Sequence, residues 1–261
     1  MSPQRDQILR ELGIGPQWRL RESMAPVSEP AIEARPPAAA PVETLVEETA
    51  EAMLAAPMRR VQEPAAPVAE RAASPVDASG MDWNTLATAV AECRACNLCK
   101  ARKQAVLGVG DQQADWLFVG EGPGAEEDER GEPFVGQAGK LLDAMLAAIN
   151  LRRGENVYIA NSVKCRPPNN RTPEPEETAA CWPYLERQIE LLQPKLIVAL
   201  GRPAAQTLLQ REVKIGAARG QLFDYKGIPL IVTYHPAYLL RNLSDKAKAW
   251  EDLCFARRTM A

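Results

Sequence analysis

Four short apolar runs recur in the second part of the chain and predict β-strands. They span 115–120, 157–162, 195–200 and 229–234, and they are rich in valine, isoleucine and leucine. Three of the four are almost continuously apolar, as is typical of strands that are buried on both faces of a parallel sheet.

Helical patterns fill the intervals between these runs. Residues 173–192 begin with prolines and acidic residues, as helix N-termini do, and residues 202–209 follow a strand through Gly201. The alternation predicts an α/β fold, a three-layer α/β/α sandwich around a central four-stranded parallel sheet. Residues 137–150 place a set of apolar side chains on one helical face: Leu141, Leu142, Met145, Leu146 and Ile149.

Residues 1–80 differ in composition, and we interpret them as a flexible, disordered extension of a domain that spans 81–261. The extension holds 11 of the 22 prolines and long stretches of alanine, proline and glutamate. Such a composition cannot offset the entropy of ordering, so 25–80 is predicted to be a linker. The first residues fit a short amphipathic helix, which is either a frayed terminal helix or a docking peptide for a protein partner. Its apolar residues are Ile8, Leu9, Leu12 and Ile14, with Trp18 just beyond.

Charge and targeting signals narrow the class of protein only slightly. The net charge is -3, but residues 1–80 hold 8 arginines, no lysine and 12 acidic residues, which leaves 81–261 at +1. A local basic face for DNA is compatible with that balance. No apolar run reaches the roughly 18 residues of a membrane span, and no signal peptide is evident. We therefore expect a cytoplasmic monomer without a membrane partner.

The cysteines predict a metal site. Six cysteines in a chain without a leader favour metal or redox chemistry over disulfides. Cys93 and Cys96 form a CxxC pair, whereas Cys165 and Cys181 flank a long proline-rich loop. Zinc modules usually show two tight pairs, so this wide second pair favours a 4Fe–4S cluster with a structural role. Zinc, or no metal, remains an alternative.

Two further cysteines complicate the ligand set. Cys99 forms a second CxxC with Cys96, so spacing alone leaves the ligands within 93–99 open. Cys254 falls on a predicted C-terminal helix and is expected to be a small buried residue.

A glycine-rich acidic loop, GEGPGAEEDERGEPFVG, follows the first predicted strand. It matches neither a phosphate-binding loop nor a dinucleotide fingerprint, and its acids would repel phosphate. Its glycines let backbone N–H groups approach a ligand closely. Phe134, near its end, is either a core residue or a stacking platform. The acid/base candidates are Glu121, Glu126, Glu127 and Asp128, although Glu126 and Glu129 are expected to be solvated loop charges.

Each candidate motif follows a predicted strand. The glycine-rich loop follows 115–120, Asn161 and Cys165 lie at the end of 157–162, and the only histidine, His235, follows 229–234. Ligands of parallel sheets bind at the carboxyl ends of the strands. The sequence therefore predicts a single site at that edge of the sheet.

Residues 90–258 resemble the family 4 uracil-DNA glycosylases, the iron–sulfur branch of the uracil-DNA glycosylase superfamily. Five motifs in the same order carry the resemblance: CxxC, GEGPG…EED…PFVGxAG, N-x3-CRPPxNR, the later cysteine, and HPAYLLRN. The resemblance implies a base-excision repair enzyme that flips uracil out of DNA and hydrolyses its N-glycosidic bond, leaving an abasic site. Uracil departs as an anion, so the site must stabilise that charge and orient water.

The resemblance also implies roles for the pocket residues. Asn161 pairs with the uracil edge and Phe134 stacks on the base. His235 and the backbone N–H of Gly122 bond to uracil O2, where negative charge develops. Glu127 lies where the family excludes the methyl group of thymine.

Water activation and DNA contacts are assigned less directly. The best-known relatives carry an aspartate where this chain has Gly122, so Glu121 is our candidate for positioning water or balancing the cationic sugar. Leu239 or Leu240 resembles the wedge that fills the emptied base stack. The residues expected to contact phosphates are Arg241, Asn242, Lys164, Arg166 and Arg171.

Two alternatives stay open: a glycosylase for other deaminated bases, such as hypoxanthine or xanthine, and a non-catalytic iron–sulfur DNA-binding protein. A related iron–sulfur subfamily has an inserted basic loop with a histidine that becomes covalently attached to DNA. This chain has no insertion between Asn161 and the RPPNNRTPEPEE segment, and His235 is its only histidine. We therefore predict turnover on single- or double-stranded DNA.

Overall fold

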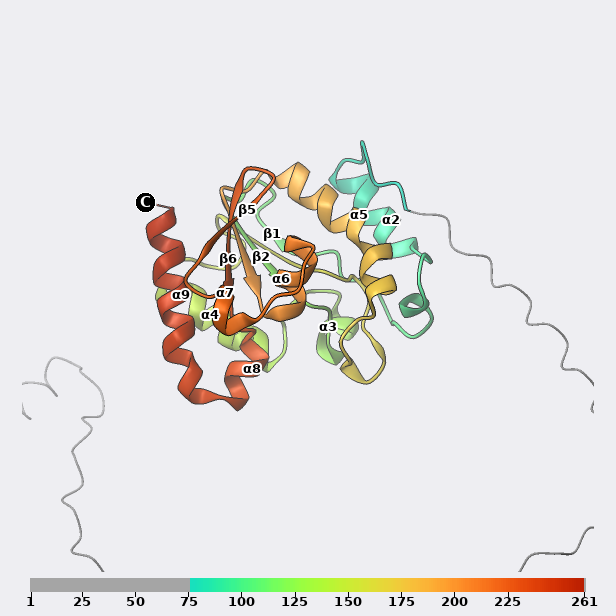
Figure 1. The fold of residues 1–261 in the computed structure, drawn as a ribbon. Coiled ribbons are helices and arrows are strands. Elements are labelled where there is room, and N and C mark those ends of the chain that lie inside the picture. The colour runs from blue at the N-terminus through green and yellow to red at the C-terminus, as the bar shows by residue number, and fades with distance from the viewer. Residues whose placement is uncertain (1–75, 261) are drawn as a thin grey trace, which may run out of the picture. The chain divides into compact units, whose positions relative to one another are not determined.

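The computed structural model describes residues 76–260, so the expectations for residues 1–75 lie outside the described part of the chain. At its centre is a six-stranded sheet in the order β1-β3-β2-β4-β6-β5 (Figure 1). The four inner strands run parallel: β3 (Val157–Asn161), β2 (Trp116–Gly120), β4 (Leu196–Leu200) and β6 (Ile228–Thr233). Their bounds follow the four apolar runs closely, which confirms the predicted α/β fold and parallel sheet.

Two antiparallel edge strands complete the sheet. These are β1 (Val109–Gly110), which pairs with β3, and β5 (Leu222–Tyr225), which pairs with β6. The sequence did not predict either one. The β1 strand is too short to show a pattern, and β5 buries only one of its four residues, so neither produces a buried apolar run.

Helices cover both faces of the sheet (Figure 1). The bounds are α2 (Trp83–Glu92), α3 (Ala125–Arg130), α4 (Gln137–Ala148), α5 (Pro175–Leu192), α6 (Arg202–Leu209), α7 (Ile215–Ala218), α8 (Pro236–Arg241) and α9 (Lys246–Thr259), with short 3-10 turns at Asn97–Lys100, Pro168–Asn170 and Leu243–Asp245.

Alternation along each strand divides the core into two layers. Successive strand side chains point to opposite faces. Leu117 and Val119 therefore pack with α5, α6 and α7, whereas Trp116 and Phe118 pack with α4, α8 and α9. The result is the predicted three-layer sandwich. Within the described residues, no helix is long and apolar enough to cross a membrane.

A third apolar cluster joins residues 76–107 to residues of the sandwich. We call residues 76–107 the cysteine lobe. Helix α2 and the segment after it pack on α5, and the Tyr184 hydroxyl donates to the Ala89 carbonyl at 3.3 Å. The buried members of this cluster are Ala78, Leu86, Val90, Leu98, Val163, Cys165, Cys181 and Tyr184.

Candidate active site and cysteine cluster

The carboxyl ends of β2 and β3 meet at Gly120 and Asn161, which are paired across the two strands. A Cβ atom on Gly120 would lie 2.4 Å from Asn161 Oδ1 and 2.6 Å from Phe134 Cζ. Only glycine therefore lets the amide of Asn161 and the ring of Phe134 converge over this strand end.

The ends of β4 and β6 bring the histidine to the same place. The Gly201 N–H donates to the Thr233 carbonyl at 2.8 Å, and a Cβ on Gly201 would lie 2.9 Å from His235 Cβ. The imidazole of His235 lies against Phe134, with ring centroids 5.4 Å apart and planes tilted by 30°. Asn161, Phe134 and His235 thus form one site, as the strand-end argument predicts.

Phe134 is held in an unusual backbone conformation. Its φ is 55°, a left-handed value that costs a non-glycine residue about 1–3 kcal/mol unless its surroundings enforce it. Arg153 supplies the restraint: Nη1 donates to the Pro133 carbonyl and Nη2 to the Phe134 carbonyl, both at 2.8 Å. Arg153 Nε is fixed in turn by Asp143 at 3.0 Å. Nothing in the sequence pattern pointed to Arg153.

The Asn161 amide is buried and incompletely bonded. The residue is 2% exposed, and its Oδ1 has no hydrogen-bond partner within the described residues. A buried acceptor without a donor costs about 1–3 kcal/mol. Such an atom is suited to a ligand that brings an N–H group.

His235 is poised as a neutral hydrogen-bond donor. Its Nδ1 accepts the Ala237 N–H at 3.1 Å, which assigns the proton of the neutral ring to Nε2. Burial lowers the pKa of His235 to about 4, helped by the nearby charge of Arg241 and opposed by Glu127. At neutral pH the ring is therefore uncharged and presents Nε2–H.

Glu121 is a partly buried carboxyl group that follows β2 directly. Burial raises its pKa above the ordinary value of 4.5, against the opposing effects of a hydrogen bond from Thr172 and the charge of Arg202. Thr172 and Arg202 were not among the predicted site residues, because their proximity to Glu121 depends on the fold.

Two acids of the glycine-rich loop organise the backbone. Glu127 Oε2 accepts the Gly124 N–H at 3.0 Å, and its Oε1 accepts the N–H groups of Val135 and Gly136 at 2.9 and 3.1 Å. Asp128, 3% exposed, accepts the Lys103 N–H at 2.9 Å. Glu127 thus ties the start of α3 to the Phe134 loop, and Asp128 ties the same helix to the cysteine lobe.

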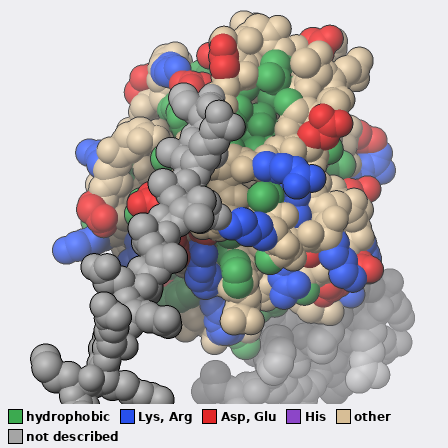
Figure 2. Space-filling model, turned by 90° about the vertical axis from the view of Figure 1, so that its right-hand side faces the viewer, with side chains coloured by type: hydrophobic (Ala, Val, Ile, Leu, Met, Phe, Trp, Pro, Cys, Tyr) green, Lys and Arg blue, Asp and Glu red, His purple; other side chains and the backbone are tan. Residues whose placement is uncertain are grey.

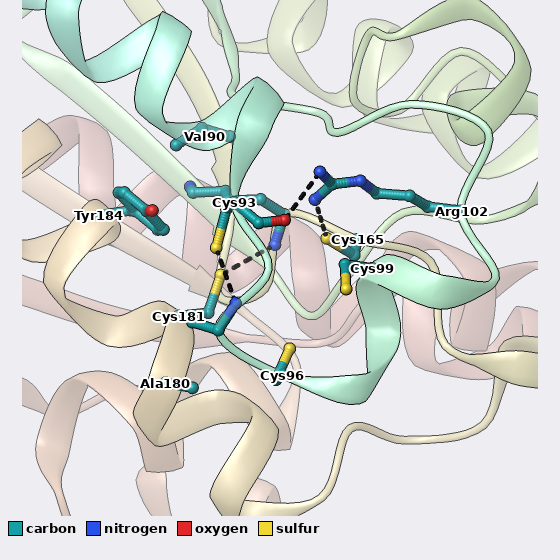
Figure 3. Close-up of a pocket in the computed structure, with 11 residues that line it drawn as sticks. Val90, Cys93, Cys96, Cys99, Arg102, Cys165, Ala180, Cys181 and Tyr184 are labelled. Carbon is teal, nitrogen blue, oxygen red and sulfur yellow. Dashed lines mark hydrogen bonds between the residues drawn. The ribbon is translucent and has the colours of Figure 1, made fainter. Parts of the chain in front are cut away.

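The four predicted metal-binding cysteines line one small pocket (Figure 3). Cys93 and Cys96 come from the segment after α2, Cys165 follows β3, and Cys181 lies on α5. Cys99 lines the same pocket, whereas Cys254 lies on α9 and is partly buried. The fold therefore gathers cysteines that are far apart in the chain.

The guanidinium group of Arg102 lies against one of these sulfurs. Arg102 Nη1 donates to Cys165 Sγ at 2.8 Å, while its Nη2 donates to the carbonyls of Ala91 and Cys93 at 2.7 and 2.9 Å. Burial raises the pKa of Cys165 to about 11 and that of Cys181 to about 12. Both are therefore thiols at neutral pH unless a metal takes the place of the proton.

The residues expected to contact DNA divide by exposure. Leu240 is 41% exposed, whereas Leu239 is 1% exposed and packs in the core. Figure 2, which views the right-hand side of Figure 1, shows Lys and Arg side chains interspersed with Asp and Glu side chains. The expectation that Lys164 contacts phosphate is wrong, because this side chain is 1% exposed.

The three arginines expected at phosphates have different surroundings. Arg241 is exposed at the end of α8, and Arg166 is partly exposed with its Nε donating to Asn170 at 2.8 Å. Arg171 is engaged within the protein, since its two Nη groups donate to the carboxylate of Glu177 at 2.8 and 2.7 Å.

Known proteins share this chain's sequence across the site. The family model described as the uracil DNA glycosylase superfamily matches residues 107–254. The chain belongs to this superfamily, in its type-4 branch. A type-4 uracil-DNA glycosylase from Thermotoga maritima is 49% identical over 161 residues, which cover 61% of this chain and 83% of the relative.

Two further type-4 uracil-DNA glycosylases support the branch. The protein from Pyrobaculum aerophilum is 44% identical over 181 residues, covering 66% of this chain and 92% of the relative. The protein from Archaeoglobus fulgidus is 48% identical over 159 residues, covering 58% and 79%. The uracil-DNA glycosylase match spans β1 to α9, the elements that build the strand-end site.

Thiolate ligands such as these hold either zinc or an iron–sulfur cluster. Among the described residues, no three His, Cys, Asp or Glu side chains lie close enough to hold one metal ion. Nevertheless, five cysteines line a common pocket, Cys99 and the four predicted ligands, with Arg102 and Lys164 beside them. A cluster of several irons spans a wider set of thiolates than zinc does, and the net negative charge of such a thiolate-bound group matches these cations.

Proposed function

We propose that this chain removes uracil from DNA by hydrolysing the N-glycosidic bond, which leaves an abasic site. The observation that carries this proposal is the buried Oδ1 of Asn161, which has no hydrogen-bond partner among residues 76–260 and lies beside the ring of Phe134. Uracil supplies what this environment lacks, an N3–H donor in the plane of a ring that stacks on an aromatic side chain.

Base selectivity follows from the two ends of the Asn161 amide. Oδ1 accepts from uracil N3–H, and Nδ2 donates to O4. Cytosine presents an unprotonated N3 and an amino group instead, so both bonds are lost. Leaving buried polar groups unpaired costs about 1–3 kcal/mol each, and sites built on such bonds reject mismatched ligands by about 10⁴-fold.

The leaving uracil anion is stabilised by neutral donors. His235 Nε2–H and the backbone N–H of Gly122 donate to O2, where negative charge grows as the glycosidic bond breaks. Because the pKa of His235 is about 4, the imidazole keeps its single donor proton throughout the reaction at neutral pH. No covalent intermediate is required.

Glu121 and the surrounding loops complete the mechanism. The Glu121 carboxylate orients the attacking water or balances the cationic sugar. Glu127 fixes the Phe134 loop, which in this proposal excludes the methyl group of thymine. Leu240, rather than the buried Leu239, fills the emptied base stack.

DNA-backbone contacts and the metal group take supporting roles. Arg241 and Arg166 hold phosphates. Arg171 stabilises the loop between Cys165 and Cys181 through its ion pair with Glu177. We assign a 4Fe–4S cluster to Cys93, Cys96, Cys165 and Cys181, where its bonds would fasten the cysteine lobe to α5. Its proposed role is structural.

The proposal extends to the compartment and to other partners. Cysteine ligands stay reduced in the cytoplasm, which is where we place the protein, as a monomer. The apolar residues Ile8, Leu9, Leu12 and Ile14 are proposed to dock on a protein partner through the long linker.

The test compares oligonucleotides that hold uracil, cytosine, thymine or hypoxanthine at one position, under single-turnover conditions. We expect excision of uracil alone. Asn161→Asp should slow it by about 100-fold or more, because the carboxylate cannot donate to O4, while iron content is unchanged. Excision of hypoxanthine in preference to uracil would reassign the substrate. An unchanged rate in Asn161→Asp would remove Asn161 from the site.

A further inference from the structure

We propose that Lys164 is a positioning residue for Asn161, and that it transmits the influence of the cysteine ligands to the base-binding site. The proposal rests on the proposed role of Asn161 in holding uracil. Lys164 lies three residues after Asn161 and directly before Cys165. It is 1% exposed and ranks among the largest fully buried side chains of the described chain.

The Lys164 ammonium group is held by two buried partners. Nζ donates to the Asn161 carbonyl at 2.9 Å and to Gln188 Oε1 at 2.5 Å. Gln188, on α5, is 0% exposed, and its Nε2 donates to the Leu107 carbonyl at 3.0 Å and to the Tyr158 hydroxyl at 3.1 Å. The ammonium group is therefore fixed by α5, β3 and the cysteine lobe together.

Burial of this charge requires compensation that an apolar residue would not need. An ammonium group taken out of water is unfavourable unless its N–H groups are bonded and negative charge lies nearby. A methionine would fill the same space without that cost. The hydrogen bond to Asn161 is what methionine could not provide, which points to a positioning role for the lysine.

With the bond from Lys164 to the Asn161 carbonyl, both polar groups of the peptide unit between Asn161 and Ser162 are hydrogen-bonded. The N–H of Ser162, from the same peptide unit as the Asn161 carbonyl, donates to the Gly120 carbonyl at 2.9 Å. Lys164 holds the other end of that unit. With both ends fixed, the plane of the peptide and the direction of the Asn161 side chain are set. A misplacement of about 1 Å in such a group can slow a reaction about 100-fold.

The backbone of Lys164 belongs to the cysteine site. Its N–H donates to Cys181 Sγ at 3.2 Å, and its carbonyl accepts the Val106 N–H at 2.8 Å. One residue thus bonds a metal-ligand sulfur through its main chain and the base-binding asparagine through its side chain. A change at the sulfurs reaches Asn161 through this residue.

The experiment is a double-mutant cycle on the iron-loaded full chain, with Lys164→Met and Asn161→Ala. Lys164→Met should lower the single-turnover rate of uracil excision by about 10–100-fold in the unaltered chain, and by less than about 3-fold in the Asn161→Ala background. It should also weaken equilibrium binding of free uracil by about 10-fold while iron content is retained. Lys195→Met is the matched control, because the Lys195 side chain lies directly before β4 and is 70% exposed. This variant should not change the rate of uracil excision.

Equal rate losses in both backgrounds, or no loss at all, would overturn the proposal. If Lys164→Met fails to fold or to hold iron, Gln188→Leu replaces Lys164→Met in the same cycle. Gln188→Leu removes the Oε1 acceptor that holds the Lys164 ammonium group, and Gln188 is not adjacent to a cysteine in the sequence. We expect a loss of about 3–10-fold that disappears in the Asn161→Ala background. An unchanged rate for Gln188→Leu would then refute the proposal. The single variant Asn161→Ala tests the proposed function separately, since activity that survives it refutes the base-binding role alone.

Discussion

In the proposed mechanism, His235 acts as an uncharged hydrogen-bond donor. The Ala237 N–H occupies Nδ1, and burial holds the pKa near 4, so Nε2–H is the only donor that the ring offers at neutral pH. A neutral donor stabilises the uracil anion without first having to lose a bound counterion. The contribution of His235 is therefore one well-placed hydrogen bond.

This reasoning predicts a graded response at position 235. His235→Ala should lower the single-turnover rate by about 100-fold or more, as removal of one oxyanion donor does. His235→Gln keeps an N–H donor and should retain at least about 10-fold more activity than the alanine variant. Equal rates for the two variants would show that the hydrogen bond is not what His235 supplies.

Glu121 predicts the acid side of the pH profile. Its folded pKa is raised above 4.5, so the carboxylate that the mechanism needs is lost as the pH falls through that raised value. His235 becomes charged only at lower pH, near its pKa of about 4. The rate should therefore be level near neutral pH and decline on the acid side through Glu121.

Single-turnover rates from about pH 4.5 to 8 check this prediction in the original chain and in Glu121→Gln. The glutamine variant should be about 100-fold slower and should lack the acid decline. A decline of the same shape in Glu121→Gln would assign the titration to another group.

At the scale of elements, the loop between α3 and α4 carries Phe134, the proposed stacking platform for the base. Phe134 lies there with a left-handed backbone, held by Glu127 from one side and by Arg153 from the other. Arg153 comes from the segment after α4, so the platform depends on two loops that are separate in the sequence.

Arg153→Met should release the Pro133 and Phe134 carbonyls and lower the rate of uracil excision by about 10-fold, because the ring loses its fixed position. Arg152→Met is the control, since the Arg152 side chain is 73% exposed and pairs only with Glu155 among the described residues. Single-turnover rates for both variants check the prediction. Similar losses in the two variants would contradict a specific role for Arg153.

The same scale separates what the sequence could predict from what it could not. The inner strands and the long helices follow from apolar periodicity, and the strand-end rule placed Asn161 and His235 together. Arg102 and Arg153 were missed because their partners are mainly backbone groups and a sulfur from other segments, which leave no pattern in the chain. Asp128 was predicted as an acid/base candidate, whereas it is buried and accepts the Lys103 N–H. At Lys164 the local pattern is misleading, since a lysine beside arginines in a loop resembles a phosphate contact, whereas the structure buries its side chain.

At the scale of the whole molecule, the cysteine pocket joins the lobe of residues 76–107 to the sandwich. Helix α2 and the segment after it pack on α5, and Arg102 donates to Cys165 Sγ across the junction and to the Cys93 carbonyl within the lobe. A cluster bound by these cysteines would add covalent links at the same place. Binding of a metal group to the folded state stabilises that state.

Cys181→Ser should therefore lose iron and lower the Tm by more than about 5 °C, because the lobe is no longer fastened to α5. Cys254→Ser, on α9 and away from the pocket, should change neither quantity. Iron analysis and thermal unfolding of both variants test this assignment. Full iron content in Cys181→Ser would exclude Cys181 as a ligand, and Cys99, which lines the same pocket, would then be the candidate fourth ligand.

Removal of the extension is predicted to spare catalysis. Deletion of residues 1–75 should leave the rate of uracil excision within about 3-fold, since the site is built from elements that follow. The cut is placed before Val76 because Ala78 is buried in the cysteine lobe. A loss near 100-fold would show that the extension takes part in catalysis.

The measurement that tests the central mechanism most directly is repeated uracil release by the iron-loaded full chain from an excess of a labelled uracil-containing oligonucleotide. The mechanism predicts several abasic sites per protein molecule, revealed as alkali-dependent strand breaks, with no protein–DNA adduct on a denaturing gel. Intact strands from folded, iron-loaded protein, or one adduct per protein in place of turnover, would contradict it.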